Sequence, residues 1–131
     1  MRFFTILFLF LVAASGADSD LAGHYSGEWK SNSAGGGGSF RLNLDATAGG
    51  TWKCEVVFTY AGAEVKTQMH EVKVNQSKLD AAYDFDLMGN ALRSHITGEL
   101  KGKAFDGVYH TTTVDGSAAV DDGVWNASQA K

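Results

Sequence analysis

The sequence predicts an all-β protein, an antiparallel up-and-down meander of about eight strands that closes into a small barrel. Two observations lead to this prediction. Short runs in which apolar and polar residues alternate follow one another along the chain, and this is the period of a half-buried strand. Glycine-containing turns separate the runs, and the 131 residues include 16 glycines and no proline. Turns built from Gly, Asn, Asp and Ser favour tight hairpins between neighbouring strands.

Four strands are expected in the N-terminal half, after a short leader at 18–22. The alternation assigns them to 23–31, 40–45, 51–60 and 64–74. Four consecutive glycines at 35–38 predict a flexible loop over 32–39, because glycine has no side chain to order it. Within the fourth strand the apolar residues change from odd to even positions after Met69, which predicts a β-bulge near His70 and Glu71.

Two hairpins in the C-terminal half have registers that the sequence can test. If the strand at 79–87 turns at Gly89-Asn90, then Leu87 faces Leu92 and Tyr83 faces Ile96. If the next turn is Gly102-Lys103, then Leu100 faces Phe105 and Ile96 faces Tyr109. Both registers gather apolar residues on one face, whereas a slip of one residue would turn each strand inside out.

The last hairpin is expected to turn at 115–117 and to pair Val114 with Ala118. This register sets the large ring of Trp125 opposite Gly107. The polar tail at 126–131 is expected to fray.

The first and last strands are expected to pair and so close the sheet. They share a motif, Gly27-Glu28-Trp29 in the first strand and Gly123-Val124-Trp125 in the last. The same Gly-x-aromatic triplet recurs at 23–25, 50–52 and 107–109. We interpret these triplets as structural, because a glycine beside an aromatic residue of the neighbouring strand permits tight curvature.

Composition and the N-terminus indicate a secreted protein with one domain. Residues 1–17 have the pattern of a secretory signal peptide, with Arg2, an apolar run at 3–14 and small residues after it. The apolar run is shorter than the ~20 residues of a spanning helix, so no membrane association is expected after cleavage. Residues 18–131 would then form the domain, in the periplasm or outside the cell. A net charge of −4 without any Lys/Arg run argues against nucleic acid as a partner.

Cys54 is the only cysteine, so no disulfide within the chain is possible. It falls in the apolar set of its strand, with Trp52 and Val56 on either side. We interpret it as a small buried hydrophobic residue, and a reactive thiol is the alternative.

The opening of the domain, Gly27-Glu28-Trp29-Lys30-Ser31 followed by a meander, resembles the calycins: lipocalins, fatty-acid-binding proteins and avidins. Phe105-Asp106-Gly107-Val108-Tyr109 also looks like a hairpin of the avidins. The chain departs from the pattern because it lacks the usual lipocalin disulfide, and the avidin ligand contacts have no residue-by-residue match. The resemblance implies a barrel with one closed end and a ligand mouth at the other.

The expected function is non-enzymatic binding of a small apolar or amphipathic molecule inside the barrel. The candidate binding residues are the large aromatic side chains of the inner face: Trp29, Trp52, Phe58, Tyr83, Phe85 and Tyr109. The opposing interpretation is that these side chains simply fill the barrel, whose interior is only just wide enough for them. The alternative function is a protein-interaction or inhibitor domain that contacts its partner through the loops at 35–38 and 115–117.

No residue pattern predicts an enzyme or a cofactor. No nucleophile elbow, phosphate loop or calcium-binding loop is present in the sequence. His95 and His110 are expected to lie opposite one another on the outer face, with Glu99 and Asp106 as a second pair. Two histidines with carboxylates could hold Zn²⁺ or Cu²⁺, but we interpret this face as a solvated polar surface without a metal.

Overall fold

The structure is a computed structural model that describes residues 21–33 and 35–129. Its strands are β1 (Gly23–Ser31), β2 (Gly37–Ala46), β3 (Trp52–Tyr60), β4 (Ala63–Lys66), β5 (Gln68–Asn75), β6 (Lys78–Leu87), β7 (Asn90–Lys101), β8 (Ala104–Thr113) and β9 (Ala119–Gln129). A short 3-10 helix, η1 (Ala48–Gly50), joins β2 to β3. Over these two ranges, no helix has the length and apolar character needed to cross a membrane. The predicted signal peptide at 1–17 lies outside the described residues.

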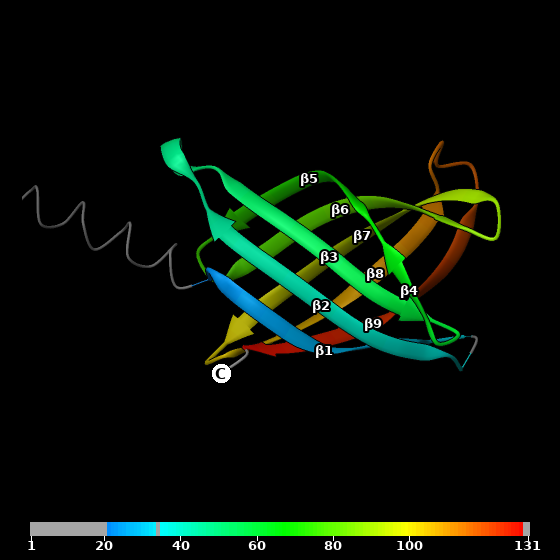
Figure 1. Cartoon of the computed structure of the whole chain (residues 1–131), viewed down its shortest axis with the longest axis horizontal. Coiled ribbons are helices and arrows are strands. Elements are labelled where there is room, and N and C mark those ends of the chain that lie inside the picture. Colours follow the sequence, from blue (N-terminus) through cyan, green and yellow to red (C-terminus); the bar gives the residue numbers. More distant parts are fainter. Residues whose placement is uncertain (1–20, 34, 130–131) are drawn as a thin grey trace, which may run out of the picture.

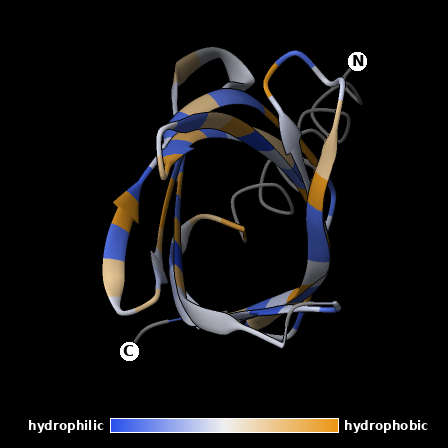
Figure 2. Cartoon of the chain, turned by 90° about the vertical axis from the view of Figure 1, so that its right-hand side faces the viewer, coloured by the Kyte–Doolittle hydropathy of each residue, from blue (hydrophilic) through white to orange (hydrophobic). Residues whose placement is uncertain are grey.

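All nine strands belong to one antiparallel sheet, in the order β4-β3-β2-β1-β9-β8-β7-β6-β5. The predicted all-β meander is confirmed, and the first and last strands do pair. β1 and β9 lie side by side in the middle of the sheet (Figure 1), with Trp29 directly opposite Trp125. Viewed from one end, the sheet curls into a barrel-like ring (Figure 2).

The ring has a seam where the sequence predicts a single fourth strand. That segment is two strands, because β4 pairs with β3 whereas β5 pairs with β6. Thr67 lies between them and donates a hydrogen bond from Oγ1 to the carbonyl of Val56, at 2.6 Å. The predicted bulge is present, as a register shift between Met69 and Glu71. The chain changes partner within a few residues, so it cannot continue as one regular strand.

One of the two predicted hairpin registers is correct. β7 and β8 pair as expected, with Leu100 opposite Phe105 and Ile96 opposite Tyr109. The prediction for β6 and β7 is wrong by two residues, because the loop is Met88-Gly89 rather than Gly89-Asn90. Both loop residues have positive φ, 54° and 82°, as a type I′ turn requires. A slip of two residues keeps every side chain on its predicted face, which is why face patterning alone does not detect it.

The last hairpin agrees with the prediction near its open end and departs from it near the turn. Trp125 lies opposite Gly107 as expected. A register shift between Thr111 and Thr112 then gives a bond from the Thr113 N–H to the Ala118 carbonyl, in place of the predicted pairing of Val114. The expected fraying over 126–129 is wrong, because these residues pair with both β1 and β8.

Two segments predicted to be irregular are part of the packed fold. β2 begins at Gly37, inside the predicted flexible loop, because Gly38 pairs with Trp29 in the ladder. Leu21, predicted in the leader, is only 2% exposed, and its carbonyl accepts a hydrogen bond from the Tyr25 hydroxyl at 2.8 Å. Leu21 therefore helps to close the end of the barrel at which β1 begins.

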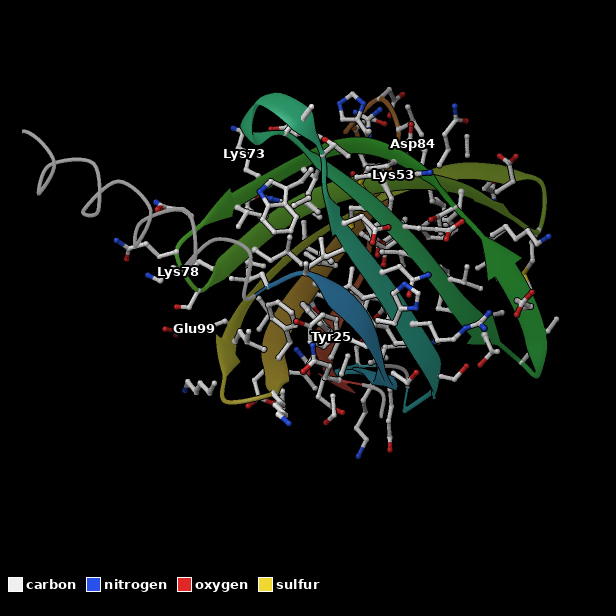
Figure 3. The ribbon with its side chains drawn as sticks, turned by 60° about the vertical axis from the view of Figure 1, so that its left-hand side comes forward. Tyr25, Lys53, Lys73, Lys78, Asp84 and Glu99 are labelled. Atoms are coloured by element: carbon white, nitrogen blue, oxygen red, sulfur yellow. The ribbon has the colours of Figure 1, made fainter. Side chains whose placement is uncertain are left out.

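The core lies inside the ring, and the predicted inner face is largely correct. Tyr25, Leu42, Val56, Ile96 and Trp125 are among its buried side chains. Cys54 is buried as predicted, and burial together with the nearby charge of Glu55 raises the pKa of its thiol to about 12. Charged residues such as Lys73, Lys78 and Glu99 project from the outer face (Figure 3), as the alternation along each strand requires.

Candidate functional site

A cavity of about 370 Å³ lies inside the barrel, at the end where β1 stops and β9 begins. We call this end the mouth. Of the six predicted binding residues, five line the cavity: Trp29, Phe58, Tyr83, Phe85 and Tyr109. The sixth, Trp52, is not among the lining residues, because it starts β3 at the opposite end of the sheet. It packs against the core there and is half-buried.

The aromatic rings of the cavity wall contact one another in defined orientations. The Trp29 ring meets Phe58 and Tyr109 edge to face, with ring centroids 6.2 and 6.0 Å apart. It stacks nearly parallel to Tyr60, at 6.4 Å. Phe58 in turn meets Phe85 edge to face at 5.1 Å. Such pairs add stabilisation beyond the area they bury, so the wall is preformed rather than loose.

The position of Trp29 is fixed by its neighbours on two successive strands. Its indole occupies the space that a side chain on Gly38 would need, since a Cβ at Gly38 would lie 2.8 Å from Nε1. The same Nε1 donates a hydrogen bond to the Thr59 carbonyl at 2.9 Å. The glycine of β2 and the carbonyl of β3 therefore set where this ring stands.

The polar groups of the cavity, of which Asp121 is the most consequential, were not predicted from the sequence. Its two carboxylate oxygens accept hydrogen bonds from Ser31 Oγ at 2.7 Å and from the Tyr109 hydroxyl at 2.9 Å. Asp121 lies four residues after the predicted turn at 115–117, and it shares the odd-numbered inner face of β9 with Trp125. The alternation that places Trp125 and Gly123 on the inner face continues two residues further back to Asp121. Followed that far, it predicts that this carboxylate faces inward.

Two hydroxyls that also line the cavity, those of Ser94 and Thr111, are hydrogen-bonded to each other. Both are buried, and both occupy inward positions of their strands. The nearby phenol of Tyr83 has a pKa raised mainly by burial. Burial first, and then the hydrogen bond to Asp121, raise the pKa of Tyr109. Both phenols therefore stay protonated at neutral pH, and Tyr109 is a donor.

The predicted histidine pair is present on the outer face, where His95 lies directly opposite His110. His95 Nε2 is 2.6 Å from Asp80 Oδ1, and His110 Nδ1 is 4.0 Å from Asp122 Oδ2. Within residues 21–33 and 35–129, no three His, Cys, Asp or Glu side chains are placed to hold a metal ion. Each imidazole faces a carboxylate of its own, and all four side chains are exposed.

The two loops proposed as partner contacts both rim the mouth. The Asn32 N–H donates a hydrogen bond to the Asp122 carbonyl at 2.9 Å. This bond joins the segment before the 35–38 loop to β9, the strand that follows the 115–117 turn. Asp115 accepts hydrogen bonds from Thr113 Oγ1 and from the N–H and hydroxyl of Ser117. These bonds, with the Ser117 N–H as the largest contribution, lower the pKa of Asp115 to about 2. The 115–117 turn is therefore ordered by its own side chains.

Comparison of the chain with known protein families, with characterised proteins and with solved structures finds no match. The geometry of the cavity is therefore the basis for the function proposed below.

Proposed function

We propose that this protein is a secreted, non-enzymatic binding module that holds a small apolar or amphipathic ligand in a calycin-like barrel. The observation that carries the proposal is the cavity of about 370 Å³ with its aromatic wall. Cavities of ~300–1,000 Å³ lined by aromatic side chains and a few polar groups are typical of small-molecule sites. The opposing interpretation, in which large side chains fill the barrel completely, has to account for this space.

The amphipathic character of the ligand follows from how the cavity wall is divided. Phe58, Phe85 and Trp29 supply an apolar surface, whereas Ser31 and Asp121 supply polar groups. An apolar body gains free energy by leaving water for the first surface. A polar head can remain hydrogen-bonded at the second, so that it avoids the cost of unpaired burial.

Titration with a neutral apolar fluorophore, N-phenylnaphthylamine, tests the proposal. We expect saturable binding with a change in tryptophan fluorescence that comes from Trp29, because this ring lines the cavity and Trp52 does not. Trp29→Phe should remove the change in tryptophan fluorescence, and Trp52→Phe is the matched control that should keep it. A response that survives Trp29→Phe would place the probe elsewhere on the molecule.

Filling the cavity supplies a second test. Leu92→Phe adds volume at a lining position and should weaken probe binding, whereas Thr97→Phe adds the same ring on the outer face of β7 and should not. Thermal unfolding of both variants checks that each still folds. If both bind the probe as the parent does, the proposal of an interior site is wrong.

Secretion rests on the predicted signal peptide at 1–17. Expression of the full chain with N-terminal sequencing of the exported product should give a mature start close to residue 17. A product that keeps its N-terminus inside the cell would contradict this part of the proposal.

The alternative function, a protein-interaction or inhibitor domain, is favoured by one observation. Both candidate loops stand at the same end of the barrel, so a single partner could contact them together. Pull-down with the mature chain separates the two functions. Binding to a protein should be lost when residues 35–38 or 115–117 are replaced and kept in Trp52→Phe.

A further inference from the structure

The cavity holds a carboxylate that its apolar wall does not explain. Among the described residues that line the cavity, Asp121 is the only one with a charged side chain. None of the ion pairs within 21–33 and 35–129 includes Asp121. Asp121 is half-buried and shares the cavity with aromatic rings, so a ligand that covers its carboxylate has to supply a compensating group.

The hydrogen bonds at Asp121 leave part of its acceptor capacity open toward the cavity. Ser31 Oγ reaches Oδ1 and the Tyr109 hydroxyl reaches Oδ2. A carboxylate has about four acceptor positions, so roughly two remain for a ligand. Both donors are neutral hydroxyls, which orient the carboxylate without cancelling its charge. Tyr109 remains a neutral donor, because burial and Asp121 itself raise the pKa of its phenol.

The aromatic rings nearest to this carboxylate also favour positive charge. Tyr109 bonds to Asp121 through its hydroxyl, and its ring meets Trp29 edge to face at 6.0 Å. Both rings line the same cavity as Asp121. The faces of Trp and Tyr rings attract ammonium and guanidinium groups, more strongly where water is excluded.

The charged residues around the mouth of the cavity also favour a cationic ligand. The mouth carries Asp86, Asp115 and Asp122 around its rim, with Lys30 as a basic residue on the outer face of β1. The opposite end carries both signs of charge, with Lys78, Lys101 and Lys103 beside Asp45, Glu99 and Asp106. Lys78 and Glu99 are seen together at this end (Figure 3). The acidic residues of the rim favour the approach of a cation to the mouth.

We propose that the cavity selects an organic cation, with its ammonium or amidinium head at Asp121 and its apolar body against the aromatic wall. This inference rests on the proposed binding function and adds the chemical class of the ligand. A neutral ligand would leave the carboxylate without a counter-charge, and an anionic head would be repelled by it. The cationic head would donate hydrogen bonds to Asp121 in addition to those from Ser31 and Tyr109.

The experiment compares three probes with the same body: naphthylethylamine, naphthylethanol and naphthylacetate. Calorimetry at neutral pH and low salt on the mature chain should rank the amine first, the alcohol second and the carboxylate last. Asp121→Asn keeps the size of the side chain and one acceptor but removes the charge. It should weaken amine binding by about thirtyfold, the usual effect of removing one partner of a buried charge pair, and should leave alcohol binding unchanged.

Two further variants control for folding and for charge alone. Asp122→Asn removes the same charge one residue away, on the outer face, and should weaken amine binding far less than Asp121→Asn does. Asp121→Glu keeps the charge and should retain most of the affinity that Asp121→Asn loses. Thermal unfolding of each variant shows whether the barrel is intact.

The outcomes separate this inference from the function on which it rests. If amine and alcohol bind the parent equally, or if Asp121→Asn binds the amine as tightly as the parent, the cation inference is overturned and the binding function stands. If none of the three probes binds while N-phenylnaphthylamine does, the cation inference is likewise overturned and the binding function stands. If no probe binds at all, both proposals fail.

Discussion

Trp29 and Trp125 occupy equivalent positions on the paired strands β1 and β9, and each is held in the same way. Trp29 lies over Gly38 of the next strand and donates to the Thr59 carbonyl of the strand beyond. Trp125 lies over Gly107 and donates to the Thr97 and Val108 carbonyls, both at 3.2 Å. The two arrangements extend in opposite directions from the β1–β9 pair. Trp125 is buried in the core, whereas Trp29 is left facing the cavity.

Gly107→Ala tests this packing. A Cβ at Gly107 would lie 2.1 Å from the Thr97 carbonyl oxygen and 2.6 Å from Trp125 Nε1, so backbone and ring must both shift. We expect the free energy of unfolding to fall by about 2 kcal/mol, as is usual for overpacking. Denaturant unfolding measures it. Gly36→Ala is the control, since a Cβ there meets nothing within 4 Å. Equal stability of the two variants would mean that Trp125 does not require glycine beneath it.

The buried thiol of Cys54 should make the free energy of unfolding depend on pH in the alkaline range. Burial, and then Glu55, raise the pKa of its thiol from 9.0 to about 12 in the folded chain. The unfolded chain therefore releases this proton at lower pH than the folded chain. The stabilisation is fully present below pH 9 and is lost as the pH rises from 9 toward 12. The slope of the unfolding free energy against pH in this window should be smaller in Cys54→Ala, and an unchanged slope would contradict the burial of the thiol.

At the scale of elements, the β6–β7 hairpin shows that strand patterning determines which face a side chain occupies, whereas the turn residues determine the register. Patterning places Phe85 and Leu92 on the inner face in either of two registers that differ by two residues. The turn decides between them, because Met88 and Gly89 both adopt positive φ. The resulting register also sets Asp84 opposite Arg93, with a bond of 2.6 Å between Arg93 Nε and Asp84 Oδ1.

Substitution of Met88 distinguishes the two registers. Met88 is 82% exposed and sits at φ 54°, where most side chains are strained but asparagine is tolerated. Met88→Asn should raise the free energy of unfolding by about 1 kcal/mol, and Met88→Val should lower it. Thermal unfolding of both variants checks this. If valine stabilised and asparagine did not, Met88 would belong to a strand, as in the register that turns at Gly89-Asn90.

The seam between β3 and β5 depends on the side chain of Thr67. Its bond to the Val56 carbonyl lies where the backbone ladder changes partner. Thr67→Val should lower stability by about 1 kcal/mol and speed hydrogen exchange in the neighbouring part of β3. Thr97→Val, on the exposed face of β7, makes the same chemical change without this bond. Equal exchange rates in the two variants would mean that the seam is held by packing alone.

At the scale of the whole molecule, β1 is a central strand although it comes first in the chain. It pairs with β2 on one side and with β9 on the other. Its inner face supplies Tyr25 to the closed end and Trp29 and Ser31 to the cavity. The continuity of the curled sheet and the construction of the site therefore depend on the same strand.

Deletion of Gly23–Ser31 tests this dependence. The deletion should expose two unpaired strand edges and open the core, so that the remaining chain aggregates or loses its cooperative unfolding transition. A synthetic peptide spanning residues 21–33 should restore the transition when it is added during refolding. A truncated chain that stays monomeric and unfolds cooperatively without the peptide would show that β1 is not required to hold the sheet together.

The sequence by itself determined which side chains face inward. This was enough to predict the all-β class, the pairing of β1 with β9 and five residues that line the cavity, out of six predicted binding residues. Alternation within a strand is local, so it can be read without knowing the neighbours. Tertiary structure decided what depends on partners: the two-residue shift at Met88, the change of partner at Thr67, and the place of Trp52 outside the cavity. It also placed Asp121 inside, because the registers of β9 with β1 and β8 set Gly123 between Ser31 and Tyr109 and so bring Asp121 within hydrogen-bonding distance of both.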